Sequence, residues 1–189
     1  MTMALQMSNP NYDRVYGNKY DRSIGITEIA KLVRKDIKHA IKVGALPQLK
    51  ASVRISRFAG GQSLSVYVKS FEHGVINPAF VKVQQDHPHD TKEWYWTPRF
   101  LLEAEQALKT LTAIVEAYNM DGSDVQSDYF CVNFYKTVDF DWDLTDSSRK
   151  AIEAQLAVEA EAAKPSAIDA AIAALGADDL ARPQAPWNF

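Results

Sequence analysis

Lysine recurs along one predicted helix at a spacing that suits binding to phosphate groups. Lys31, Lys35, Lys38 and Lys42 follow one another at steps of four, three and four, and Arg34 lies beside them. On a helix, such steps place side chains on one face. A basic stripe of this kind binds nucleic-acid backbones through charge and counterion release, with little sequence information. The alternative interpretation is a solvated helix face, where lysine is a common residue.

A second basic and aromatic set falls in a predicted β-hairpin. Residues alternate between apolar and polar over 51–69, so one face of the hairpin is expected to pack on the first helix. The other face then carries Arg54, Tyr67 and Lys69. If that face is open, these side chains extend the basic surface of the helix toward the same partner.

Three adjacent aromatic residues are candidate anchors for a protein partner. Trp94, Tyr95 and Trp96 follow a polar segment and precede a predicted helix. Three large neighbouring rings cannot all point into one core, and exposed aromatic residues dominate the energetics of protein interfaces. The alternative is that two rings are buried and the third caps the helix.

Acidic residues cluster after the last predicted core strand. Asp139, Asp141 and Asp143 occupy alternate positions, which is the pattern of carboxylates that bind Ca²⁺ or Mg²⁺. Apolar residues interleave with them, so an edge strand with an acidic outer face is the simpler interpretation. Such a strand can also meet a basic protein surface or imitate nucleic-acid phosphates.

The sequence offers no convincing catalytic or metal constellation, so we expect no enzyme activity and no cofactor. His87 and His89 alternate with acidic residues in a polar loop, but a third ligand is not evident. Cys131 lies in a predicted strand, where a cysteine usually behaves as a small apolar residue. No phosphate-binding loop, dinucleotide fingerprint or serine nucleophile motif is present.

Hydrophobic periodicity predicts the elements that position these residues. Apolar residues at steps of three and four predict helices over 27–42, capped by Thr27, and from Pro98 to about Tyr118. A Gly-Gly turn joins the hairpin strands. Further strands are predicted over 75–84 and 128–138, with a loop over 85–96 between the first of them and the second helix.

These elements predict an α+β fold in which a two-layer arrangement packs an antiparallel sheet of three or four strands against two helices. Residues 1–24 are expected to form an N-terminal arm and residues 25–146 the core domain. Residues 147–189 are rich in Ala and Glu, which predicts a helical tail with an extended tip. The tail is expected to contain one helix capped by Ser147 or Ser148 and another capped by Ser166, and it is weakly tied to the core or serves in a homodimer.

Composition limits the class of protein and its compartment. The chain of 189 residues has one cysteine, which suits a reducing compartment, and no apolar run or leader typical of a membrane or secreted protein. Residues 1–70 hold 12 Lys and Arg against 4 Asp and Glu, whereas the remainder holds 9 against 20. We expect a cytoplasmic protein without membrane contact, whose two oppositely charged parts bear on its partners.

The stretch from Ile26 to Phe140 resembles a large polyvalent protein-associated domain of phage and conjugative-element proteins. The resemblance lies in the helix ITEIAKLVRKDIKHAI, the hairpin ASVRISRFAGGQSLSVYV and the later segment SDYFCVNFYKTVDF. It implies a mobile-element origin and a counter-defence or DNA-associated role in the host cell. The family supplies no established catalytic residues.

We therefore expect a phage or plasmid accessory protein that binds and inhibits a host defence complex of the CRISPR or restriction type, molecule for molecule. The alternative is a nucleic-acid-binding module that uses the basic helix face. A metal-dependent enzyme built on His87 and His89 is a third and weaker option.

Overall fold

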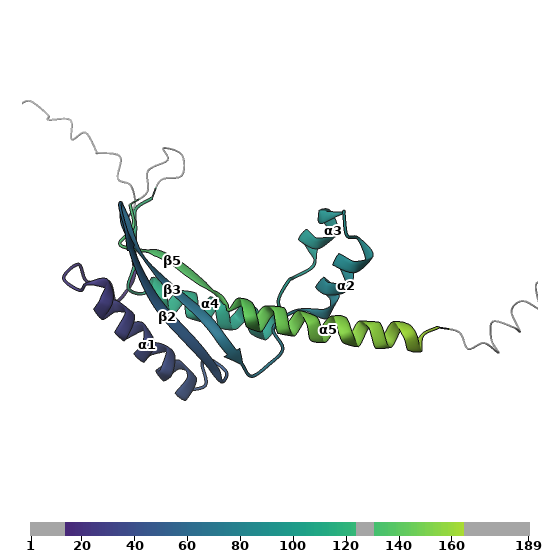
Figure 1. Cartoon of the computed structure of the whole chain (residues 1–189). Coiled ribbons are helices and arrows are strands. Elements are labelled where there is room, and N and C mark those ends of the chain that lie inside the picture. The colour runs from purple at the N-terminus through teal and green to yellow at the C-terminus, as the bar shows by residue number, and fades with distance from the viewer. Residues whose placement is uncertain (1–13, 124–130, 165–189) are drawn as a thin grey trace, which may run out of the picture. The chain divides into compact units, whose positions relative to one another are not determined.

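The computed structural model describes residues 14–123 and 131–164, and these divide into two compact units, residues 1–150 and 151–189. The described chain is an α+β protein, as predicted. Its main sheet has the order β2-β3-β5 (Figure 1). Two helices, α1 and α4, pack on this sheet, and a two-stranded sheet joins β1 to β4.

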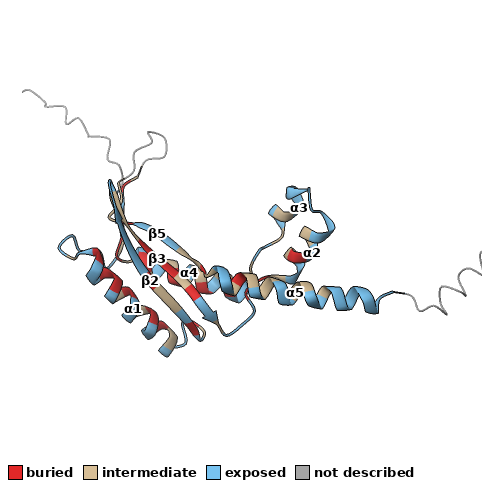
Figure 2. Cartoon of the chain, in the orientation of Figure 1, coloured by how far each residue is buried: buried red, intermediate tan, exposed pale blue. Residues whose placement is uncertain are grey.

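Helix α1 spans Ile26–Lys42, close to the predicted bounds. Its buried face faces the sheet, as the red stripe in Figure 2 shows, and comprises Ile26, Ile29, Ala30, Val33, Ile37 and Ala40. The predicted cap is wrong, because Gly25 precedes the helix without a side-chain cap. The Thr27 hydroxyl instead accepts a hydrogen bond from Arg57 at 3.1 Å.

The predicted hairpin is confirmed as β2 (Leu49–Phe58) and β3 (Gly61–Phe71), which pair antiparallel. Gly60 in the turn has a φ of 95°, a value that residues with a Cβ rarely adopt. The inner face buries Val53, Leu64, Val66 and Val68. On the outer face Arg54 and Lys69 are exposed and Tyr67 is half-buried, so the predicted inner and outer faces of the hairpin are both confirmed.

The third strand of the sheet departs from the predicted antiparallel pattern. Strand β5 (Tyr135–Phe140) runs parallel to β3, with Val138 opposite Val66. A parallel neighbour requires a crossover connection, and the chain between β3 and β5 supplies one through α2, α3 and α4. The strand predicted over 128–138 corresponds to β5, which begins at Tyr135 and ends at Phe140. Residues 124–130 lie outside the described residues.

The region between β3 and α4 was predicted as a strand and a loop, and both predictions are wrong. Residues Pro78–Asp86 form helix α2, because Asn77 caps it by accepting from the amide of Ala79 at 3.0 Å and Pro78 occupies the first helical position. Thr91–Trp96 form the short helix α3. Only an isolated bridge between Ile76 and Phe100 has strand character here.

The second core helix, α4, spans Leu102–Glu116 and starts four residues later than predicted. The Thr97 hydroxyl donates to the carbonyl of Glu93 at 3.2 Å, so Thr97 closes α3 and does not open α4. Helix α4 contacts both β5 and α1. The two core helices, α1 and α4, therefore cover the same face of the sheet, as predicted.

Two very short strands add a second sheet that the sequence did not suggest. Strand β1 (Val15–Tyr16) pairs antiparallel with β4 (Met120–Asp121), which joins part of the predicted N-terminal arm to the end of α4. Residues 1–13 of the arm lie outside the described residues.

The C-terminal helix α5 spans Trp142–Ala162 and begins before the predicted Ser147 or Ser148 cap. Both serine hydroxyls instead donate to the Leu144 carbonyl, at 3.0 and 2.7 Å. The predicted helix after Ser166 and the extended tip lie outside the described residues. Within the described part, no helix is both long enough and apolar enough to cross a membrane.

We expect removal of residues 151–189 to lower the melting temperature by only a few degrees. Every buried residue among those described lies between Ile26 and Thr145, within the first compact unit. Thermal melts of the full chain and of residues 1–150, followed by circular dichroism, measure the difference. A truncated chain that does not fold would show that the core depends on the removed segment.

Candidate partner-binding surfaces

Helix α3 carries two highly exposed aromatic side chains. Tyr95 is 81% exposed and Trp96 is 79% exposed, and their rings meet edge to face with centroids 5.2 Å apart. Trp94 is half-buried, and its indole Nε1 donates to the carbonyl of His87 at 3.0 Å. The structure thus brings the three predicted aromatics together and exposes two of them, where the alternative expected two to be buried.

The segment that carries these rings is closed at its base by hydrogen bonds. The amide of Asn77 donates to the carbonyl of Arg99 at 3.0 Å, and the Asn77 side chain donates to the carbonyl of Pro98 at 2.9 Å. Leu101 then donates to the carbonyl of Val75 at 3.0 Å. Residues 75–77 and 98–101, at the two ends of the segment that contains α2 and α3, are therefore joined by hydrogen bonds.

Local hydrogen bonds stabilise α3 at its start and connect it to α2. The carboxylate of Asp90 accepts a hydrogen bond from the amide of Lys92 at 3.0 Å, which satisfies a free donor at the start of the helix. The bond from Trp94 to His87, the C-cap residue of α2, ties α3 to α2. Rigid aromatic side chains lose little conformational entropy when they bind, which favours their use as anchors.

The basic face of α1 is exposed, and its members differ in what they contact. Lys31, Lys35, Lys38 and Lys42 are all exposed. Lys31 forms an ion pair with Glu28 at 2.9 Å on the same helix. Arg34 reaches the sheet, where its Nη2 donates to the carbonyl of Val53 at 2.5 Å. Arg34 therefore connects α1 to β2, and one of its nitrogens is already used in this hydrogen bond.

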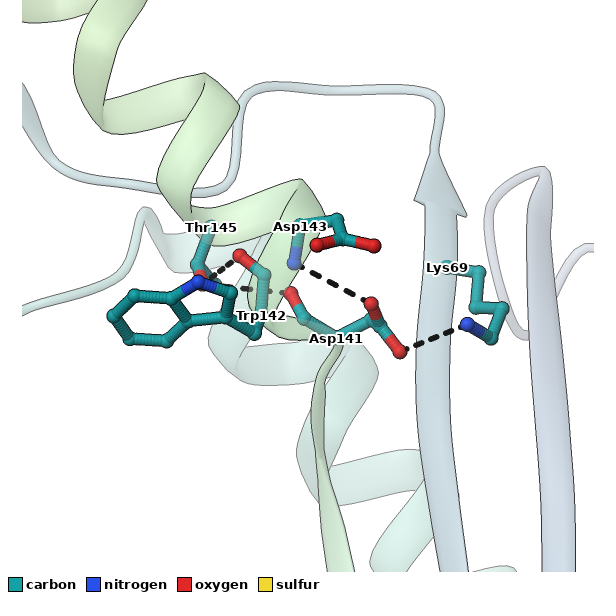
Figure 3. A network of polar contacts seen from close by, with 5 residues as sticks. All are labelled: Lys69, Asp141, Trp142, Asp143 and Thr145. Carbon is teal, nitrogen blue, oxygen red and sulfur yellow. Dashed lines mark hydrogen bonds and ion pairs between the residues drawn. The ribbon is translucent and has the colours of Figure 1, made fainter.

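The outer face of the sheet is open but not strongly basic. Arg54 and Lys69 supply two positive charges beside the half-buried Tyr67. Lys69 pairs with Asp141 at 3.0 Å (Figure 3). Asp139 lies opposite Tyr67 in the register of β3 and β5. These acidic neighbours reduce the suitability of this face for a phosphate backbone, which binds through net positive charge.

The acidic cluster has a structural explanation. The carboxylate of Asp141 accepts from the amide of Asp143 at 3.3 Å, and its carbonyl accepts from the amide of Thr145 at 3.1 Å (Figure 3). These are the bonds of a helix start, and the ion pair with Lys69 lowers the pKa of Asp141. Asp139 lies in β5, which is an edge strand of the main sheet, as predicted. The prediction is wrong for Asp141 and Asp143, because Asp141 precedes α5 and Asp143 is exposed in its first turn.

Residues that sequence reasoning did not select also contribute to the surface. Trp142 is 75% exposed at the start of α5. Phe58 and Tyr135 are exposed on the outer sheet face, with ring centroids 5.8 Å apart, and both rings approach Gly61 closely. The sequence signal for Phe58 and Tyr135 was their alternation with inward-facing residues, but the partner strand of Tyr135 could not be known.

A partly exposed polar network joins Lys19 in the N-terminal segment to Asp36 of α1 and to Tyr118 just after α4. The ammonium of Lys19 donates to the Asp36 carboxylate at 2.5 Å, and the hydroxyl of the buried Tyr118 donates to the same oxygen at 2.7 Å. Burial raises the pKa of Asp36, but the hydrogen bonds from Lys19 and Tyr118 outweigh it, so the pKa falls below 3.8. The network therefore links Lys19 to α1 and to the segment that follows α4.

We expect this network to stabilise the fold at neutral pH and to fail in acid. Because the pKa of Asp36 is lower in the folded protein, its contribution is complete well above 3.8 and is lost as pH falls through the folded value. Lys19 is about half exposed, so we expect about 1 kcal/mol or less. Melts of the wild type and Asp36→Asn should differ most near neutral pH and converge in acid. A constant difference at all pH values would contradict this.

Metal binding finds no geometric support in the described part of the chain. Within residues 14–123 and 131–164, no three His, Cys, Asp or Glu side chains are grouped so that they could hold a metal ion. His87 and His89 both follow the end of α2 and are exposed. Cys131 is a half-buried free thiol.

Comparison with known proteins places no further constraint on the function. No protein-family model, no curated protein and no solved structure matches this chain.

Proposed function

We propose that this chain acts by binding a protein partner stoichiometrically, and that the exposed pair Tyr95 and Trp96 is its anchor. The observation that carries the proposal is the high exposure of two large aromatic rings on a short helix that is capped by Asp90 and bonded to the end of α2. Aromatic side chains at the centre of an interface contribute a large share of binding energy when they are desolvated. A patch of at least about 1,000 Å² in total around them suffices for a specific complex.

The partner class is inferred from the resemblance to domains of phage and conjugative-element proteins. On that basis we propose a host defence complex of the CRISPR or restriction type as the target, in the host cytoplasm. The chain inhibits it by occupying a surface and not by altering it chemically.

Capture from host lysate tests the anchor. Wild-type chain, the Tyr95→Ser/Trp96→Ser double variant and the Val158→Ser control are used as bait, and captured proteins are identified by mass spectrometry. Val158 is 70% exposed on α5, so the control also removes an exposed apolar side chain. We expect a defence component with wild type and control but not with the double variant. Equal capture by all three baits would contradict the proposed anchor.

One observation favours nucleic-acid binding as a second candidate function. All four lysines of the α1 stripe are exposed, on the side of the helix opposite its buried residues. Exposed lysines at this spacing can each neutralise a backbone phosphate. The acidic neighbours of the outer sheet face limit this interface to α1 and its immediate surroundings.

Replacing Lys31, Lys35, Lys38 and Lys42 together by Glu is expected to abolish any nucleic-acid binding while the chain stays folded. In the wild type, the slope of log affinity against log salt should be steeper by about 0.9 for each lysine that contacts duplex phosphate. Fluorescence anisotropy with a labelled duplex over a salt series measures both quantities. Binding that is unchanged in the folded variant would exclude α1 as the contact.

A further inference from the structure

A groove separates α1 from the edge of the main sheet. Its cavity is about 280 Å³, and it shares no residue with the aromatic surface of α3. The walls are largely apolar, and the lining residues are Arg34, Ile37, Lys38, Ile41, Leu49, Lys50, Ala51 and Val53. This volume lies just below the range of about 300–1,000 Å³ for small-molecule pockets, so the groove suits one or two side chains.

One wall of the groove is an unpaired strand edge. Strand β2 stands at the end of the order β2-β3-β5, and no other strand pairs with its outer side among the described residues. Arg34 approaches the carbonyl of Val53 from α1, so this carbonyl points away from β3. A carbonyl has two lone pairs, and Val53 can therefore accept a second hydrogen bond from an added strand.

The charges around the groove are all of one sign. Among the described residues that line it, the charged ones are Arg34, Lys38 and Lys50, and all three are basic. A ligand that enters between α1 and β2 therefore meets positive charge on both sides. An acidic ligand is favoured, because rim charges select the sign of the partner.

We propose that this groove binds an extended acidic peptide segment with apolar side chains, which adds as a strand to the edge of β2. The strand edge supplies backbone hydrogen bonds, Ile37, Ile41 and Leu49 supply apolar contact, and the cations pair with carboxylates. A nucleic acid fits less well, because a phosphodiester backbone makes little use of apolar walls. The inference goes beyond the proposed α3 anchor and does not depend on it.

Two matched pairs of charge reversals test the groove. Lys38→Glu/Lys50→Glu alters its lining, whereas Lys31→Glu/Lys35→Glu makes the same charge change elsewhere on α1. The probe is a labelled eight-residue peptide of alternating Glu and Val, read by fluorescence anisotropy. We expect saturable binding to the wild type, at least about tenfold weaker binding to the groove variant, and a change within about twofold for the control variant.

Three outcomes overturn the inference. The first is the absence of saturable peptide binding to the wild type. The second is equal weakening by both variants, which indicates diffuse charge attraction. The third is tighter binding of a single-stranded oligonucleotide that the groove variant alone loses, which assigns the groove to nucleic acid.

A peptide variant covers the case in which the groove variant does not fold. Replacing Val by Ser in the peptide retains every carboxylate and removes the apolar contacts. We expect this peptide to bind the wild type at least about tenfold more weakly. Equal binding of the two peptides would contradict the proposed contact of the peptide's apolar side chains with the groove walls.

Discussion

Replacing Tyr95 and Trp96 together by serine is expected to weaken binding of the purified partner by about 100-fold or more, because each aromatic anchor of an interface contributes about 2 kcal/mol or more. Both rings are exposed in the free chain, so no core contact is lost. The melting temperature should therefore stay close to that of the wild type. Isothermal titration calorimetry with the partner captured from lysate measures the change in affinity.

The single variants add a second criterion for this anchor. Because the two rings contact each other edge to face, their effects on binding are expected to be coupled and not additive. Val158→Ser should leave the affinity within about twofold, as most surface substitutions have small effects. A double variant that binds the partner as tightly as the wild type would remove α3 from the interface.

The largest loss of stability is expected at Asn119, which is buried at the end of α4. Its side-chain Nδ2 donates to the carbonyl of Phe134 at 3.0 Å, and its Oδ1 accepts from the amide of Phe134 at 3.1 Å. Asn119→Leu leaves both backbone groups without these partners, at about 1–3 kcal/mol each. For a chain of this size, we expect a fall in melting temperature of about 5–15 °C.

An exposed asparagine provides the matched control. Asn18 lies in the turn after β1 and is exposed, so Asn18→Leu should change the melting temperature by about 2 °C or less. Asn119→Asp keeps the acceptor for the Phe134 amide and loses the donor, and it is expected to fall between the other two. A melt of Asn119→Leu within about 2 °C of the wild type would show that water or other groups replace both bonds.

The elements with strong local patterns could be predicted from the sequence. The stripe Ile26, Ile29, Val33 and Ile37 defined α1, and alternation on both sides of Gly60 defined the hairpin. In each case one periodicity persists for ten residues or more, and burial then follows the same period. The exposure of the α1 lysines followed from the same stripe.

The short helices and the strand order could not be read as easily. The apolar residues near Val81 suggested a strand, but the Asn77 cap and Pro78 start a helix, and these two residues were the available signal. Parallel pairing of β5 with β3 has no local signature, because it depends on a crossover through α4. Aspartates that looked like a binding cluster include Asp141, whose role is to start α5.

The sequence showed which residues make up the candidate surfaces, but it did not show how the fold arranges them in space. The aromatic run was visible in the sequence, but only the base formed by Asn77 with Pro98 and Arg99 explains why Tyr95 and Trp96 are presented together. The groove beside β2 combines α1 lysines with Lys50, and this combination arises from the packing of α1 on the sheet edge.

Titration of the chain against a fixed amount of the purified, captured target tests the central proposal most directly. The target's own activity is the readout, and the ratio of the two proteins is the variable. Stoichiometric binding predicts a linear fall in activity with a break near an equimolar ratio, and the same break shifted or absent with Tyr95→Ser/Trp96→Ser. Complete silencing at a small fraction of equimolar, with the target covalently altered, would contradict action by binding and indicate an enzyme.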